Sequence, residues 1–479
     1  MVRRDFLIGG RLKGALIYID GLADTAIIEE ALIPHLLGAE IPPELFARQA
    51  PEDLVDLMER ALPMGDVRLV KSMAEVVEHV LSGDTAIFVD GHSQALVTST
   101  RAFEHRGVEE PITESVVRGP REGFVENLRA NTALIRRRLK TPDLKVESFR
   151  IGRYSATAVY VIYLSSLADP ALIREVRRRL ERIDVDGILE SAYIEELIED
   201  NPASPFPQID HTERPDKVAA SLLEGRAAIL IDNTPFVLLV PAVFVQFIQS
   251  SEDYYERFYL ASFLRMARFI ALNIALILPA VYVAVSTFHQ EMLPTSLLIK
   301  LAAQREGVPF PAVIEALLLE LAFEMLREAG VRLPRPVGQA VSIVGALVIG
   351  EAAVNAGLVS AAMVIVVALT GIASFALPYF AMAITIRLLR FVLLVAAGIL
   401  GFYGIMIVLL VILVHLCALR SFGVPYLSPV SPYRLQDWKD VFVRAPRWAQ
   451  DTRPSRIGYR DITRQGKEQR PGPREDGRQ

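Results

Sequence analysis

The stretch that decides the fold is Val337–Ile386, which reads VGQAVSIVGALVIGEAAVNAGLVSAAMVIVVALTGIASFALPYFAMAITI. It is fifty residues long and holds one charged residue, Glu351. A membrane-spanning helix needs roughly 20 apolar residues, so the stretch has room for two such helices. Asn355-Ala356-Gly357 offers a hinge between them. The sequence therefore predicts that this part of the chain lies in a membrane.

The first of these two helices has two distinct faces. Residues at steps of three and four on one face are small and would let helix backbones approach closely; they are Ser342, Ala346, Gly350, Ala353 and Gly357. The adjacent face carries Val344, Val348, Glu351 and Asn355. If several copies pack through the small face, the second face lines a pore, with valines as hydrophobic constrictions and Glu351 as a carboxylate ring that favours cations. The alternative is that the small face packs within one subunit and Glu351 pairs with a polar neighbour.

Composition supports a chain with a soluble part and a membrane part. The 479 residues have a mean hydropathy of +0.33 although 22% of them are charged. Cys417 is the single cysteine, which excludes an intramolecular disulfide or a thiolate metal cluster. The start of the chain lacks the apolar core of a signal peptide, so we expect the N-terminal region to be cytosolic. A net charge of -5 without a concentrated basic face argues against nucleic acid as a partner.

A repeated pattern divides the soluble part. Gly83–Gly91 reads GDTAIFVDG and Gly225–Asn233 reads GRAAILIDN. Each follows a short helical pattern and precedes a second apolar strand, and Asp-Gly and Asp-Asn suit tight hairpin turns. The spacing predicts two related α/β subdomains in tandem.

We therefore expect an α/β cytosolic region of two tandem subdomains followed by an all-α polytopic membrane domain. The expected divisions are 1–118 and 119–250 for the subdomains, 251–420 for the membrane domain and 421–479 for a basic tail. Counted from Arg420 to the last residue, this end of the chain holds thirteen Lys and Arg against seven Asp and Glu, a net of +6. The membrane domain is expected to hold about four spans, at 269–288, 337–355, 358–379 and 391–419, with an amphipathic helix at 311–330.

The sequence also predicts where two groups of charged residues in the membrane domain lie. Arg387 and Arg390 fall in the predicted connector before the last span, and an even number of spans places that connector outside the cell, against the positive-inside rule. Glu320 and Glu324 lie on the polar side of the 311–330 helix. They are expected on a solvated face, with an acidic vestibule as the alternative.

Enzymatic motifs are missing from the sequence. There is no HExxH, GxSxG or P-loop, and the seven histidines show no metal-ligand spacing. The sequence predicts no catalytic, cofactor-binding or metal-binding residues, no cofactor, and a protein that is not an enzyme.

Several ordered motifs are typical of one family. They are Gly119–Phe124, Asn131–Arg138, Ser204–Gln208, Thr212–Asp216, Glu252–Phe258, Ile343–Gly350 and Ala356–Ser360. Over roughly residues 5–450 the chain resembles the A subunit of spore germinant receptors, the GerA family of endospore-forming bacteria.

The resemblance implies a multi-pass protein of the spore inner membrane with a cytosolic N-terminal domain. It implies partnership with a transporter-like B subunit and a lipoprotein C subunit. It also implies a homo-oligomer, with a pentamer as the expected form, that acts as a ligand-gated cation-release channel at the start of germination. The alternatives are an accessory channel subunit of the stage V sporulation protein AF type and a non-conducting scaffold for the receptor complex. A solute carrier is disfavoured because four spans show no inverted repeat.

Overall fold

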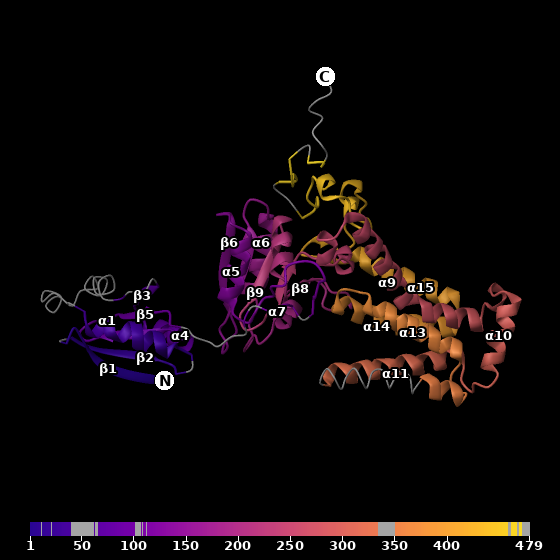
Figure 1. The fold of residues 1–479 in the computed structure, drawn as a ribbon, viewed down its shortest axis with the longest axis horizontal. Coiled ribbons are helices and arrows are strands. Elements are labelled where there is room, and N and C mark those ends of the chain that lie inside the picture. The colour runs from indigo at the N-terminus through magenta and orange to yellow at the C-terminus, as the bar shows by residue number, and fades with distance from the viewer. Residues whose placement is uncertain are drawn as a thin grey trace, which may run out of the picture. The chain divides into compact units, whose positions relative to one another are not determined.

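The fold is described from a computed structural model. The described residues are 1–10, 12–20, 22–39, 62, 66–100, 107, 109–111, 113–333, 350–457, 461–466 and 469–471. The chain divides into two compact units, Met1–Arg106 and Gly107–Gln479. Figure 1 labels their helices and strands.

The first unit is built on a five-stranded antiparallel sheet. Its strands, in the spatial order β1-β2-β4-β5-β3, are β1 Val2–Ile8, β2 Leu12–Tyr18, β4 Thr85–Val89, β5 Ala95–Thr98 and β3 Val67–Val70. Helix α1 (Ile33–Leu37) and η1 (Ile27–Leu32) bury Leu32 and Leu36 in one core. Helix α4 (Met73–Leu81) packs Val76 and Val80 into a second core. The predicted hairpin is β4–β5, which turns through Gly91 at φ +85°.

The second unit repeats this sheet with the same connectivity. Its strands, in the order β6-β7-β9-β10-β8, are β6 Leu144–Ile151, β7 Thr157–Leu164, β9 Ala227–Ile231, β10 Val237–Val240 and β8 Asp210–Thr212. Helix α8 (Pro215–Leu223) precedes β9 as α4 precedes β4. The β9–β10 hairpin turns through Asn233, a residue that tolerates the positive φ of +68° found there. The predicted tandem repeat is confirmed.

Helices cover both faces of the second sheet, as Figure 1 shows for α5 and α6. Helices α6 (Pro170–Glu181) and α7 (Ser191–Ile198) share one core with Ile229 and Leu238. Helices α5 (Leu128–Arg138) and α8 share the other core with Leu230 and Leu239. Because both faces are covered, all five residues of β9 are buried, which explains why this strand reads as a continuous apolar run.

The remainder of the second unit is helical. Its helices are α9 Phe258–Thr287, α10 Thr295–Arg305, α11 Ala312–Arg332, α13 Ala361–Phe375, α14 Phe380–Leu400 and α15 Phe402–Ala418. Among the described residues, α9 and α14 are long and apolar enough to cross a membrane, and α13 and α15 are shorter apolar helices. Helix α9 contacts α13, α14 and α15, and α11 lies against α13 and α14.

The helix boundaries differ from the expected spans at the end of this region. The residues 391–419, expected as one long span, form the second half of α14 and all of α15. The two helices are separated at Gly401, which has φ +60°. A Cβ at Gly401 would lie 2.7 Å from His289 Cε1, so this turn requires glycine. The predicted span at 269–288 lies almost wholly within α9, which begins eleven residues earlier at Phe258 and ends one residue short of 288.

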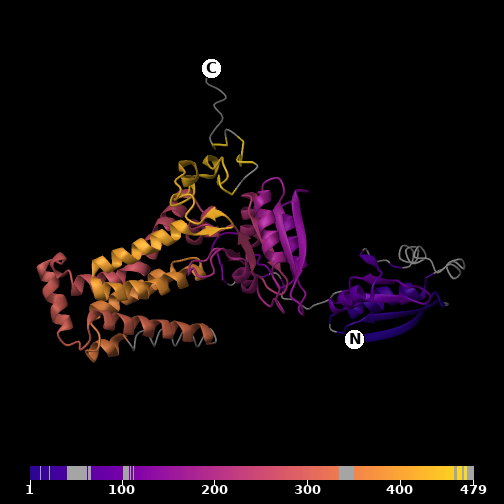
Figure 2. The ribbon, with the colours of Figure 1, turned by 180° about the vertical axis from the view of Figure 1, so that it is seen from behind.

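The C-terminal tail starts with a short hairpin and then runs back over the molecule. Strands β11 (Arg420–Ser421) and β12 (Val424–Pro425) pair, and the 3-10 turns η5 (Leu435–Lys439) and η6 (Arg447–Ala449) follow. Figures 1 and 2 show the yellow tail beside the first turns of α9. Ser262 of α9 accepts a hydrogen bond from Arg444 N at 3.0 Å, which ties the two together.

Candidate functional site in the helical region

The predicted pore-lining face is partly described. Val344 and Val348 lie outside the described residues, as do Ser342 and Ala346 of the small-residue face. Glu351 and Asn355 lie within the helical residues 350–355, and both are exposed on this single chain.

The described end of the small-residue face packs against its own chain. Gly350 and Ala353 are half-buried. A Cβ on Gly350 would lie 3.7 Å from Val364 of α13. Gly357 adopts φ +66° after the helix ends, and a Cβ there would lie 3.4 Å from the carbonyl oxygen of Gly307. Gly350 and Ala353 of the small-residue face thus face inward, while Glu351 and Asn355 face outward.

Glu315 joins α11 to the start of α13. Its carboxylate is fully buried and accepts hydrogen bonds from Ser360 N and Ser360 Oγ, both at 2.6 Å. Ser360 is the N-cap of α13, where the helix dipole favours a negative charge. Glu315 therefore holds the turn that follows the predicted pore-lining face.

Two glutamates of α11 meet two arginines of α14 in a buried cluster. Arg390 Nη2 lies 2.9 Å from Glu320 Oε2 and 3.2 Å from Glu324 Oε1. Arg387 Nη1 lies 2.9 Å from Glu324 Oε2. Arg327, one turn along α11, adds a contact of 3.3 Å to Glu324 Oε1. The side chains of Arg390 and Glu320 are each 1% exposed, so this pair is removed from solvent.

This cluster corrects two expectations. Glu320 does not lie on a solvated face, because α11 turns that face toward α14. Arg387 and Arg390 do not lie in a connector, because α14 begins at Phe380 and contains both. The sequence held a signal for this pairing. The two glutamates are four residues apart and the two arginines are three residues apart, and each spacing places both like charges on one face of a helix.

The α/β part of the second unit contacts the helices through the loop before β8. Ser204 Oγ lies 2.8 Å from His415 Nε2 of α15, and Thr385 of α14 donates to the carbonyl oxygen of Pro205. Tyr426 of the tail donates to the carbonyl oxygen of Pro207 at 2.7 Å. The loop therefore connects the sheet with both C-terminal helices.

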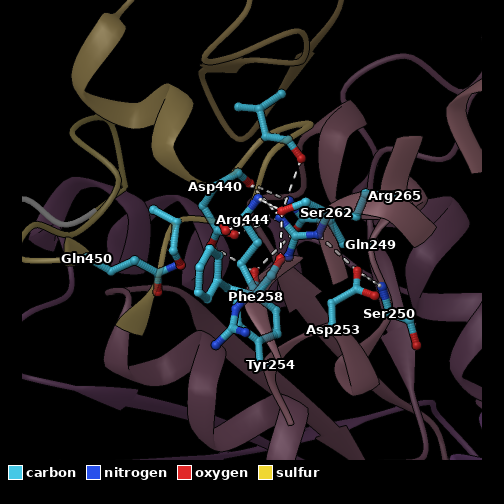
Figure 3. Close-up of polar contacts among 12 residues, drawn as sticks. Gln249, Ser250, Asp253, Tyr254, Phe258, Ser262, Arg265, Asp440, Arg444 and Gln450 are labelled. Carbon is cyan, nitrogen blue, oxygen red and sulfur yellow. Dashed lines mark hydrogen bonds and ion pairs between the residues drawn. The ribbon is translucent and has the colours of Figure 1, made fainter. Parts of the chain in front are cut away.

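A second polar network joins the start of α9 to the tail, as Figure 3 shows. Arg265, 1% exposed, donates from Nε to Asp253 Oδ2 at 2.9 Å and from Nη1 to Asp440 Oδ1 at 2.7 Å. Tyr254 donates to Asp440 Oδ2 at 2.9 Å. Burial raises the pKa of Asp440 above its ordinary value, against the lowering effect of Arg265. The network fixes the direction in which α9 leaves the α/β part.

The described ranges between residues 1 and 471 hold no candidate metal site. No group of three or more His, Cys, Asp or Glu in those ranges is arranged to hold a metal ion.

The chain matches a known family over almost its whole length. The family model described as Bacillus/Clostridium GerA spore germination protein covers residues 1–456. The chain belongs to the GerA family. This GerA-family chain is 53% identical to spore germination protein KA of Bacillus subtilis (strain 168), over 96% of its own length and 83% of that protein.

Another relative and one solved structure are also similar to this chain. Spore germination protein GerLA of Bacillus cereus is 41% identical, over 98% of this GerA-family chain and 94% of that protein. The crystal structure of the N-terminal domain of the A subunit of the Bacillus megaterium spore germinant receptor GerK3 is similar at 36% identity. That match covers 51% of this chain and 89% of the crystallised chain, with a TM-score of 0.23.

Proposed function

We propose that this GerA-family protein is the A subunit of a spore nutrient germinant receptor. In this proposal it lies in the spore inner membrane with the α/β subdomains on the cytosolic side, and it works with a transporter-like B subunit and a lipoprotein C subunit. Several copies assemble into a ligand-gated channel that releases cations when germination starts. Family membership and the apolar helices α9 and α14 support the membrane receptor role.

The observation that carries the channel proposal is the exposure of Glu351 and Asn355. These polar side chains are exposed on the helical residues 350–355, whose Gly350 and Ala353 face inward. A carboxylate exposed on an apolar membrane segment is unfavourable against lipid, so it calls for a polar partner or a water-filled path. A ring of identical chains around an axis supplies such a path, and Val344 and Val348 one and two turns earlier would form its hydrophobic gate.

The buried cluster between α11 and α14 supports a bistable helical region. Because the proposed pore helix precedes α13, and α13 contacts α11, a shift of α11 would reach the pore through the Glu315–Ser360 contact. Channel opening by small helix shifts needs packed elements of this kind.

The test is ion flux in cells that produce the A, B and C subunits together. Glu351→Gln keeps the side-chain size and removes the charge, and Val344→Ala widens the proposed gate. We expect Glu351→Gln to lower nutrient-triggered cation release and Val344→Ala to give a leak without nutrient, both followed with a membrane-potential dye. Glu181→Gln, at an exposed position at the end of α6, is the matched control.

If both variants show unchanged ion flux and germination at normal protein levels, this face does not line the pore. A receptor that assembles normally and passes no ions would favour the non-conducting scaffold.

A further inference from the structure

A large cavity with charged side chains in a mainly apolar lining lies between the α/β part and the tail, away from the proposed pore face. Its volume is about 610 Å³, and its lining comes from α8, the segment between 243 and 255, Tyr379 and the tail from Ser428 to Arg464. Figure 3 shows part of its wall, with Tyr254, Asp440 and Arg444 close together.

The carboxylates of this wall already have partners. Asp216 pairs with Arg214 at 2.9 Å, and Glu224 lies 2.8 Å from Arg464. Asp440 pairs with Arg265 at 2.7 Å. The fourth carboxylate, Asp437, accepts a hydrogen bond from Ser455 Oγ at 2.6 Å. These contacts leave the acidic side chains little capacity to neutralise further cations.

Three arginines of the same wall have no such partner. Within the described ranges, Arg444, Arg447 and Arg456 lie within 4 Å of no carboxylate. Arg444 is 5% exposed; its Nη1 donates to the carbonyl oxygen of Glu256 at 2.9 Å, and its Nε has no hydrogen-bond partner. A buried guanidinium without a close carboxylate is unfavourable. Burial lowers the pKa of Arg444, and the more distant Asp440 opposes that shift only in part. Arg447 and Arg456 are exposed.

We infer that this cavity binds an anion that carries a phosphate group, held by three arginines of the tail: the buried Arg444 and the exposed Arg447 and Arg456. Guanidinium groups present planar pairs of donors that match phosphate oxygens, and the cavity is large enough for a group of that size. The bound phosphate would supply the close counter-charge that Arg444 lacks.

Two sources offer this chemistry. One is a small soluble phosphate compound. The other is the headgroup of an anionic lipid, which the exposed aromatic residues Phe258, Tyr259 and Phe263 at the start of α9 would bring near, since aromatic side chains favour the membrane interface. The inference concerns binding alone, so it stands whether or not the protein conducts ions.

The experiment measures thermal stabilisation of the purified full-length chain in neutral detergent. The probes are inorganic pyrophosphate, short-chain phosphatidylglycerol and, as the zwitterionic comparison, short-chain phosphatidylcholine. A ligand that binds the folded state raises the Tm in a concentration-dependent way, which yields an apparent Kd. The double variant Arg447→Gln/Arg456→Gln changes exposed side chains only, and Arg118→Gln, an exposed arginine outside the cavity, is the matched control.

We expect pyrophosphate or phosphatidylglycerol to stabilise the wild-type chain more than phosphatidylcholine does. Binding by the double variant should be weaker by roughly tenfold or more, as expected for lost charge-assisted hydrogen bonds, and Arg118→Gln should bind normally. A response to pyrophosphate identifies a soluble anion as sufficient, and a response to phosphatidylglycerol alone identifies the lipid headgroup. The inference is overturned if neither probe stabilises the wild type, or if the double variant binds as tightly as the control.

Discussion

Arg390 is the residue whose surroundings depend most on packing. It lies inside α14, 1% exposed, with Glu320 and Glu324 of α11 as its counter-charges. Removing one partner of a buried ion pair leaves an uncompensated charge, whereas replacing both with apolar groups of similar size is often neutral or stabilising.

We therefore expect Arg390→Met alone to destabilise the protein by about 3–5 kcal/mol, and Glu320→Leu/Arg390→Met to recover much of that loss. Thermal unfolding in detergent measures both. The exposed pair Arg332–Glu328 is the control, and Arg332→Gln should change stability by less than about 1 kcal/mol. If the single and double variants lose the same stability, the pair stabilises the protein through more than its charges.

Glu195 of α7 is the residue with the clearest pH dependence outside the helical region. Burial raises its pKa to about 8, with further raising by Glu199, Asp210 and Glu190. His211 Nδ1 lies 3.7 Å from Glu195 Oε2 and would oppose that shift when protonated. The folded state holds the proton more tightly than the unfolded state. The contribution of Glu195 to the free energy of unfolding is therefore fully present below about pH 4.5 and is lost as the pH rises toward 8.

Glu195→Gln should remove this pH dependence. We expect the variant to equal the wild type near pH 4.5 and to be more stable by roughly 1–3 kcal/mol near pH 8.5, because the cost of ionising the buried carboxyl is gone. Tm values measured across that range provide the comparison. Glu196→Gln, at the exposed neighbouring position, should follow the wild-type profile. Parallel profiles for all three proteins would show that Glu195 ionises freely in the folded state.

At the scale of the elements, the turn at Gly401 decides that α14 and α15 are two helices. Its φ of +60° favours glycine, and an added Cβ would meet His289 at 2.7 Å. The chain therefore reverses between two apolar helices where the sequence reads as one continuous apolar run. Helical periodicity cannot reveal this break, because the glycine is surrounded by apolar residues on both sides.

Gly401→Ala should strain this turn. We expect a loss of about 1–3 kcal/mol from the left-handed backbone conformation, and more if His289 cannot move. Gly307→Ala is the control, since nothing lies within 4 Å of its added Cβ and its φ is not positive. Tm values of the two variants give the comparison, and a Gly401→Ala variant as stable as Gly307→Ala would mean that the helices can join without penalty.

At the scale of the whole molecule, the channel proposal requires more than one copy. The single chain has a mass of 53.1 kDa and leaves Glu351 and Asn355 exposed. We expect native mass spectrometry of the detergent-solubilised protein to give a particle of several times that mass. Chemical cross-linking before solubilisation would retain a ring that detergent weakens. A particle of one chain in both measurements would contradict the pore and leave a scaffold role.

Much of the α/β architecture could be read from the chain. The two hairpins follow from Asp90-Gly91 and Asp232-Asn233 between apolar strands, and the shared strand order of the two sheets follows from the repeated pattern. The candidate pore face was read from spacing alone, and it stays a prediction because Val344 and Val348 lie outside the described residues. The buried cluster was missed, since Glu320 reads as an exposed residue of an amphipathic helix and Arg390 as part of a connector.

The sequence by itself determined the local structures: strands from apolar runs, turns from residues that accept positive φ, and membrane-length helices from long uncharged stretches. These depend on neighbouring residues, whose preferences add within a few turns. Only the tertiary structure decided which charges meet. Arg390 and Glu320 lie seventy residues apart, and their pairing depends on how α11 lies against α14. Buried opposite charges stabilise each other only when packing brings them together and excludes water, and that condition belongs to the assembled helices.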